Sequence, residues 1–145
     1  MKVLLQRISR SEVRVQGEVV ASGGPGLLLL VGVGADDTGD EVPKLAEKVW
    51  NLRIFEDEDG KMNRSLADVR GEVVVVPQFT LYGDTSRGRR PSWIRAASPE
   101  VANERIEAFG AALASLGAEV SMGTFGEHME VELVNDGPVT VLLEA

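Results

Sequence analysis

The sequence predicts one α/β domain spanning residues 1–145, in which a mixed sheet folded into two layers packs against two helices on one side. Two observations support this prediction. Most apolar segments are short, alternating or bounded by glycine, as strands are, and only two have helical spacing. The 145 residues contain no linker, repeat or low-complexity tract. A chain of this length is typically one domain and can bury a core without disulfides.

The predicted strands cover most of the chain. Apolar and polar residues alternate around Gln16-Gly17, which is typical of a hairpin. The unbroken apolar run from Leu27 to Val33 is typical of a buried strand. The predicted strands are Met1–Ile8, a hairpin from Val13 to Val20, Leu27–Val33, a short hairpin from Arg53 around Asp59-Gly60, the β-prone run Glu72–Leu81, Met129–Val134 and Val139–Glu144.

Both predicted helices carry terminal signals. In the first, Asp40 is the expected N-cap, which puts Pro43 in the first turn, where no backbone donor is needed. In the second, Ser98 is the expected N-cap, Pro99 takes the first helical position and Gly117 ends the helix. The apolar stripes are Val42, Leu45, Ala46 and Val49 in the first helix, and Ile106, Phe109, Leu113 and Leu116 in the second.

Composition excludes several classes of function. Cysteine is absent and His128 is the only histidine, so disulfides, thiolate chemistry and a histidine-rich metal site are excluded, and we expect no metal or cofactor. No export or membrane segment is visible, so we expect a cytoplasmic protein. The net charge of −8 argues against a protein that binds nucleic-acid duplexes broadly, although a local basic patch would suffice to grip the end of a nucleic acid.

The segment Pro77–Asp84, PQFTLYGD, is the first candidate site. On an extended strand Gln78 and Thr80 share one face, so the end of a sheet would present an amide and a hydroxyl together. The alternative is an ordinary half-buried strand with Thr80 present for its β-propensity. A nucleophilic Thr80 would need an adjacent base, and nothing in the sequence places His128 near it. No Gly-x-Ser-x-Gly elbow is present, so a standard triad is not predicted.

The second candidate is the densest basic cluster of this acidic chain. Arg87, Arg89 and Arg90, with Arg95 just beyond, offer guanidinium groups that suit phosphate and can stack on bases. Trp93 adds a stacking surface. The alternative is a solvated loop whose arginines pair with local carboxylates.

The third candidate is the segment Asn135–Val139, NDGPV, between the last two predicted strands. Its Gly137-Pro138 pair is typical of a plain turn. The functional alternative is a rigid backbone element that contains a cis peptide, which is rare enough to indicate a constraint.

Taken together, these segments resemble the D-aminoacyl-tRNA deacylase family, formerly called D-tyrosyl-tRNA deacylases. The resemblance runs from Leu5-Gln6-Arg7 to the last strand, and Gln78–Leu81 and Asn135–Thr140 match two family signatures. Further matches are LLLLVGV, KMNRSLADV and RGRRPSW. One departure is Pro77, where the family usually has serine. A hydroxyl and a backbone donor are lost there, so no role of that serine carries over.

The resemblance implies a three-layer β/β/α fold with two main helices, assembled as a homodimer. The active site would lie at the dimer interface, near Gln78–Leu81. A cis Gly137-Pro138 loop of the other subunit would fill the space that an L-side chain needs, so selectivity would be steric exclusion. Glycine has no side chain and would escape exclusion, which makes mischarged glycyl-tRNA a second expected substrate.

The implied reaction is hydrolysis of the ester that joins a D-amino acid to the 3′ end of tRNA, assisted by the 2′-hydroxyl of the tRNA. Backbone donors such as that of Phe79 would stabilise the oxyanion. Gln78 and Thr80 would line the site, and Arg87, Arg89 and Arg90 would hold the tRNA. Two alternatives stay open. One is a dimer of this fold that binds aminoacyl-tRNA without turnover, because Pro77 replaces the serine, and the other is a generic esterase.

Overall fold

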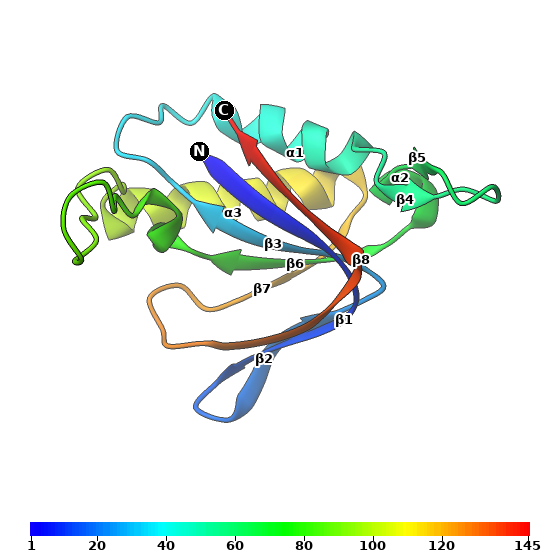
Figure 1. The fold of residues 1–145 in the computed structure, drawn as a ribbon, viewed down its shortest axis with the longest axis horizontal. Helices are drawn as coiled ribbons and strands as arrows, with labels where there is room; N and C mark the ends of the chain where they lie inside the picture. The colour runs from blue at the N-terminus through cyan, green and yellow to red at the C-terminus, as the bar shows by residue number, and fades with distance from the viewer.

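A six-stranded mixed sheet organises the protein, and the computed structural model describes all residues from 1 to 145 (Figure 1). The strand order is β2-β1-β3-β6-β7, and β8 also pairs with β1. Strand β1 is antiparallel to β2, β3 and β8, whereas β6 is parallel to β3 and to β7. The strands are β1 (Lys2–Val15), β2 (Glu18–Gly23), β3 (Gly26–Gly32), β6 (Glu72–Pro77), β7 (Glu119–Met122) and β8 (Glu130–Glu144).

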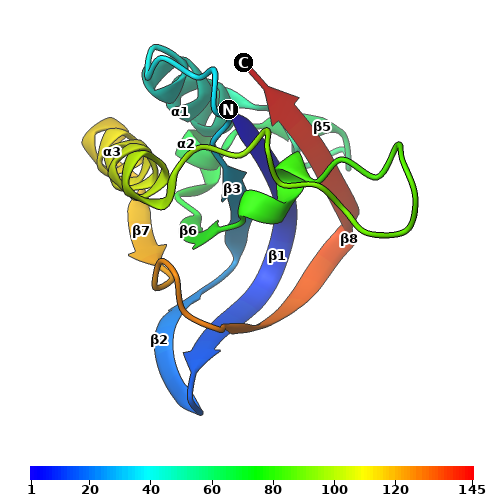
Figure 2. The same ribbon diagram turned by 90° about the vertical axis from the view of Figure 1, so that its left-hand side faces the viewer.

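Two long helices, α1 (Glu41–Asn51) and α3 (Pro99–Leu116), cover one face of this sheet (Figure 2). Their buried stripes join the larger apolar core, in which Phe109 and Leu113 are fully buried. The prediction of an α/β domain with a mixed sheet and two helices on one side is therefore confirmed. No helix is long and apolar enough to span a membrane.

The other face of the sheet is covered by strand β2, which folds back over the central strands. Strand β1 curls, so that β2 swings over the central strands and the backbone amide of Ser22 donates to Oγ of Ser121 on β7, 3.3 Å away. A second core fills the space beneath, which gives the β/β/α order of layers. It contains Ile8, Val13, Ala21, Leu28, Val74 and Val76.

The helix starts differ in one detail from the sequence prediction. Asp40 and Ser98 occupy the N-cap positions, but neither side chain makes a capping hydrogen bond. At α1 the Glu41 carboxylate instead accepts from the amides of Thr38 and Gly39, at 3.3 and 2.8 Å, and so fixes the chain that leads into the helix. Hydrogen bonds to the carboxylate, first that from its own backbone amide, lower the pKa of Glu41 to about 2.

The smaller elements were predicted only in part. The short hairpin is present as β4 (Phe55–Glu56) and β5 (Met62–Arg64). It leads into a single helical turn, α2 (Leu66–Val69), which begins with a reciprocal capping box between Ser65 and Asp68. Strand β7 was missed, and the prediction of two separate C-terminal strands was wrong because β8 runs unbroken from Glu130 to Glu144.

The prediction of a strand through Leu81 was also wrong. Strand β6 ends at Pro77, and a 3₁₀ turn, η1 (Phe79–Tyr82), follows. This turn lies against the end of β3, where glycine makes room for it. A Cβ at Gly32 would come within 2.9 Å of the Gln78 carbonyl oxygen, and one at Gly34 within 2.7 Å of the Tyr82 ring. The tertiary contact therefore overrides the local β-propensity of the segment.

Candidate active site

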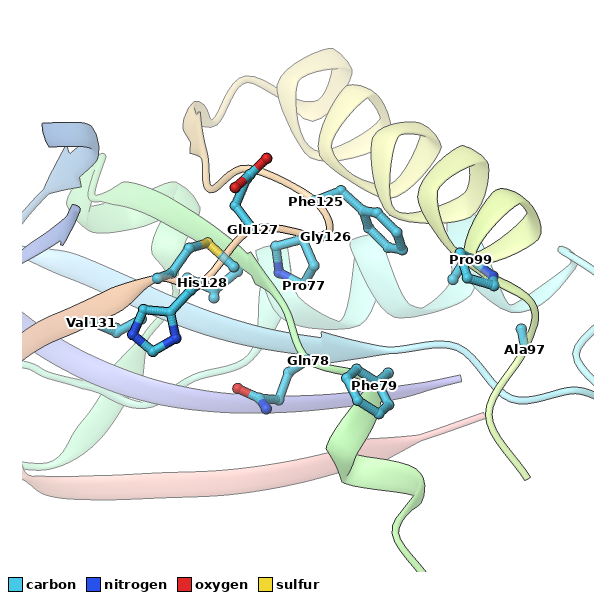
Figure 3. Close-up of a pocket in the computed structure, with 13 residues that line it drawn as sticks. Pro77, Gln78, Phe79, Ala97, Pro99, Phe125, Gly126, Glu127, His128 and Val131 are labelled. Atoms are coloured by element: carbon cyan, nitrogen blue, oxygen red, sulfur yellow. The ribbon is translucent and has the colours of Figure 1, made fainter. Parts of the chain in front are cut away.

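The turn η1 forms one wall of a pocket with a volume of about 450 Å³ (Figure 3). Pro77, Gln78 and Phe79 lead into the pocket from the end of β6. The start of α3 forms a second wall, and the connection between β7 and β8 forms the third. The remaining lining residues are Val76, Ala97, Pro99, Ala102, Phe125, Gly126, Glu127, His128, Met129 and Val131. The walls are mostly apolar, and Gln78, Glu127 and His128 add polar groups.

Gln78 and Thr80 do come together, although not as neighbours on a strand. Nε2 of Gln78 donates to Oγ1 of Thr80 across the first turn of η1. An amide is not a base, and no other side chain hydrogen-bonds to the Thr80 hydroxyl, so the structure does not build an activated nucleophile there. Thr80 is exposed and does not line the pocket.

The start of η1 leaves backbone donors free. The last ladder bond of this segment runs from the Gln78 amide to Val31 O at 2.8 Å, and the first bond of the turn runs from the Leu81 amide to Gln78 O at 3.3 Å. The amides of Phe79 and Thr80 fall between these two bonds, as the first N–H groups of a helical turn do, and have no intrahelical partner. The start of η1 therefore offers backbone donors, and no side-chain base is hydrogen-bonded to Thr80.

Pro77 fits its place because the β6–β7 ladder has already ended. The Gly123 amide donates to Val75 O at 2.8 Å, and β7 pairs no further along β6. Alternate residues of a parallel strand face the same neighbour, so an N–H at position 77 would have pointed past the end of β7. Proline at the end of a ladder loses no strand bond, and its ring adds apolar surface to the pocket.

The segment from Asp136 to Val139 is a large bulge in β8. On β1, Gln6 pairs with Thr140 and Ile8 pairs with Asn135, so Arg7 alone faces four residues of β8. The bond between Gly137 and Pro138 is cis, and both residues are exposed.

Side chains hold this bulge in place. Arg7, only 5% exposed, donates from Nε to Asp136 O at 3.0 Å and from Nη1 to Ile54 O at 2.7 Å. The side chain of Asn135 bridges the bulge, accepting from the Val139 amide at 3.0 Å and donating to Oγ1 of Thr140 at 2.9 Å. The two ends of the bulge are therefore tied by side chains on both sides of the Gly-Pro pair.

Within one chain the structure does not bring Gly137 and Pro138 to the pocket at η1, since neither residue lines it. It does bring His128 there, a residue whose location the sequence left open. His128 lies on the same side of the pocket as Gln78 and Val131 (Figure 3). No group of three or more His, Cys, Asp or Glu side chains is arranged to hold a metal ion.

Arg87, Arg89 and Arg90 lie in an exposed loop beside η1. Two hydrogen bonds of 2.9 Å between the backbones of Asp84 and Ser92 close the base of this loop. None of the three arginines takes part in an ion pair, so the alternative of arginines paired with local carboxylates does not describe this loop.

Comparison with known proteins shows the family to which this chain belongs. The model of the D-Tyr-tRNA(Tyr) deacylase family matches residues 4–144. The chain belongs to this family. A curated relative from Roseiflexus castenholzii, named D-aminoacyl-tRNA deacylase, is 54% identical over 145 residues, which cover 100% of this chain and 92% of the relative.

Two solved structures extend the likeness to the fold. A protein described as c-Myc DNA Unwinding Element Binding Protein is 36% identical, with a TM-score of 0.94 over 100% of this chain and 99% of that one. A structure described as "a probable eukaryotic D-amino acid tRNA deacylase" is 17% identical, with a TM-score of 0.83 over 98% and 97% of the two chains. The second likeness concerns the fold alone.

Arg7 is the residue of this D-Tyr-tRNA(Tyr) deacylase family member that the sequence analysis missed as part of a site. One signal could have found it: Arg7 is a charged residue among the apolar residues of β1. That it faces the Gly-Pro pair is visible only once β1 and β8 are paired. Buried charges are rare unless they are partnered, so such a position indicates a specific task.

We predict that Arg7→Met destabilises the protein by about 1.5–3 kcal/mol, because methionine keeps the apolar stem but leaves the carbonyls of Asp136 and Ile54 without their charged donor. Denaturant unfolding measures this. The matched control is Arg53→Met, since Arg53 is exposed and bonds only Asn63. Equal stability of the two variants would show that Arg7 does not hold the bulge.

Proposed function

We propose that the chain frees tRNA from D-amino acids by hydrolysing the ester bond at the 3′ end of the tRNA. It is a D-aminoacyl-tRNA deacylase, an ester hydrolase of tRNA editing. The single observation that carries this proposal is the family match over residues 4–144. The pocket beside η1 supports it, because Phe79, whose amide is unpaired within the turn, borders a space large enough for a nucleoside and an amino acid.

The proposed reaction uses water as nucleophile. Water attacks the ester carbonyl, the bond to the ribose oxygen breaks, and that oxygen takes up the proton as the free amino acid leaves. The 2′-hydroxyl of the tRNA assists the water, in keeping with the lack of a base beside Thr80. The Phe79 amide stabilises the oxyanion, and Gln78 and Thr80 fix the shape of the turn that presents it.

The apolar part of the pocket would receive the terminal nucleoside. Phe125 offers an aromatic wall beneath α3 (Figure 3). Stacking on an aromatic wall suits a nucleobase of any kind. The ester would then reach the amides at the start of η1.

Selectivity would come from a second copy of the chain. We propose a homodimer in which Gly137 and Pro138 of the partner subunit close the pocket, so that their carbonyls exclude L-side chains and admit D-amino acids and glycine. In support, the bulge is exposed and held rigid by Arg7, and β8 is an edge strand. Exposed apolar side chains on β8 offer a surface for association, namely Val131, Val134 and Leu142.

One alternative remains specific to this chain. Pro77 stands where the family usually has serine, so the same dimer would bind aminoacyl-tRNA without hydrolysing it if that serine were essential. We favour turnover, because the free amides of η1 need no side chain at position 77. We place the reaction in the cytoplasm, where charged tRNA is used.

The decisive experiment compares release of tyrosine from D-Tyr-tRNA and L-Tyr-tRNA by the purified protein. We predict turnover of the D-substrate with little or no release from the L-substrate. Binding without release would establish the non-catalytic alternative. Equal rates on both substrates would contradict steric exclusion, and activity on small esters in place of tRNA would indicate a generic esterase.

Thr80→Ala is predicted to retain substantial activity on D-Tyr-tRNA, because the hydroxyl accepts from Gln78 and has no base. Removal of a true nucleophile would lower the rate on the order of 10⁶-fold, as loss of the catalytic serine does in subtilisin. Single-turnover rates distinguish the two. A loss near that size in a folded variant would assign Thr80 the nucleophilic role.

Gly137→Ala is predicted to lower the ratio of D- to L-substrate rates. A Cβ there would lie 2.8 Å from Cγ2 of Val139 and 3.1 Å from Nη2 of Arg7, at a φ of +131° that L-residues rarely adopt. The bulge must shift, at a cost of about 1–3 kcal/mol. The control is Gly60→Ala, which also has positive φ but no atom within 4 Å. A folded Gly137→Ala dimer with an unchanged ratio would exclude the selectivity role.

The arginine loop is predicted to contact tRNA phosphate. Arg87→Ala combined with Arg89→Ala should weaken binding and reduce the slope of log affinity against log salt by about 1 per arginine. Lys44→Ala combined with Lys48→Ala changes the net charge equally on the exposed side of α1 and serves as control. If both double variants show the wild-type slope, the loop is merely solvated.

A further inference from the structure

An exposed aromatic pair beside the pocket has no role in the reaction described so far. Phe79 is 54% exposed and Trp93 is 41% exposed, and their ring centroids lie 5.3 Å apart in an edge-to-face arrangement with an interplanar angle of 71°. Large aromatic side chains left open to water commonly mark a binding surface. The backbone of Phe79 serves the pocket, but this does not explain why its ring meets a second aromatic ring outside.

The indole of Trp93 rests against backbone and is still 41% exposed. A Cβ on Gly83 would lie 2.6 Å from Cζ3 of Trp93, so the ring rests directly on the Gly83 backbone. The paired backbones of Asp84 and Ser92 fix the adjoining chain. A ring fixed in this way loses little conformational entropy when a flat ligand stacks on it.

The pair lies between the two parts of the proposed tRNA site. Phe79 lines the pocket, Trp93 touches Phe79, and the loop that begins at Asp84 carries the arginines. Those arginines make no ion pair in a chain whose net charge is −8. Aromatic rings next to unpaired cations are how proteins grip single-stranded nucleic acid, with bases on the rings and phosphates on the cations.

We propose that Trp93 binds the base of the penultimate nucleotide of the tRNA 3′ end, which stacks on the exposed part of the indole. This inference rests on the proposed function, since it assumes that the terminal nucleoside occupies the pocket. The next nucleotide then leaves the pocket past Phe79, one ring away from Trp93, and its phosphate faces the arginine loop. The charge of that loop favours RNA over a second copy of this acidic chain as the occupant.

The test uses D-tyrosylated RNA minihelices with either an intact 3′ end or an abasic penultimate nucleotide. The half-saturating enzyme concentration is measured in single-turnover deacylation. Base–aromatic stacking predicts that removing the base weakens binding by wild-type enzyme about 5- to 150-fold. Trp93→Ala should weaken binding of the intact RNA by a similar factor and show almost no further loss with the abasic RNA. Trp93→Phe should restore most of the affinity.

Ile94→Ala is the matched control, because Ile94 is the next residue and is 87% exposed. It should respond to base removal as the wild type does. A second measurement does not depend on the folding of Trp93→Ala. In Trp50→Phe, Trp93 is the only tryptophan, and its fluorescence should be quenched by the intact RNA and much less by the abasic RNA.

The outcomes separate this inference from the proposed function. If wild-type enzyme releases D-tyrosine but Trp93→Ala and wild type lose the same factor on base removal, the stacking site is wrong while the function stands. A lower dimer mass for Trp93→Ala, with that same equal loss, would assign the aromatic pair to the contact between copies and overturn the inference. If wild-type enzyme releases no D-tyrosine, the proposed function fails, and equal quenching of Trp93 by the intact and the abasic RNA would then overturn the inference as well.

Discussion

The structure depends on a mismatch in length between two paired strands. Where β1 contributes Arg7 alone, β8 contributes four residues, so the surplus chain must leave the plane of the sheet. A buried guanidinium fills the gap, and its partners are carbonyl oxygens on two different segments. A smaller side chain would leave these oxygens unpaired, and an apolar one could not bond them. The strand can therefore carry an exposed Gly-Pro pair without losing its pairing on either side.

The candidate site depends on glycines, because their lack of a side chain lets neighbouring segments pack closely. Glycines at positions 32 and 34 let the 3₁₀ turn lie on the end of β3, and Gly83 lets an indole lie on the backbone. The turn then presents amides that no neighbour uses. Backbone donors held by close packing need little reorganisation when charge develops on a substrate. Chemistry of this kind suits a chain with one histidine and no cysteine.

The sequence predicted the elements whose stability depends on residues within the same segment. Both long helices could be predicted because their caps, proline positions and apolar stripes lie within each segment. The 3₁₀ turn could not, because it depends on Gly32 and Gly34, which lie far from it along the chain. The unbroken course of β8 depends likewise on Arg7, since an Asn-Asp-Gly-Pro run is otherwise typical of a turn.

The same distinction holds for the site. Gln78 and Phe79 were predicted from one contiguous segment and do line the pocket. Phe125 and His128 come from the connection after β7, a strand too short and too weakly patterned to be predicted. Without β7 in place, nothing in the sequence indicates that this connection reaches η1.

Strand β8 takes part in the pocket of its own chain and also carries the exposed bulge, which matters for dimers that combine two different variants. Val131 lines the pocket of its own chain, whereas Gly137 and Pro138, further along the same strand, lie outside that pocket. In the dimer that we propose, each active site therefore combines the pocket of one chain with the bulge of the other. If a chain with a damaged pocket is paired with a chain with a damaged bulge, both defects fall in one site and the other site is intact. The intact site of the heterodimer would then supply up to half of the wild-type D-selective activity.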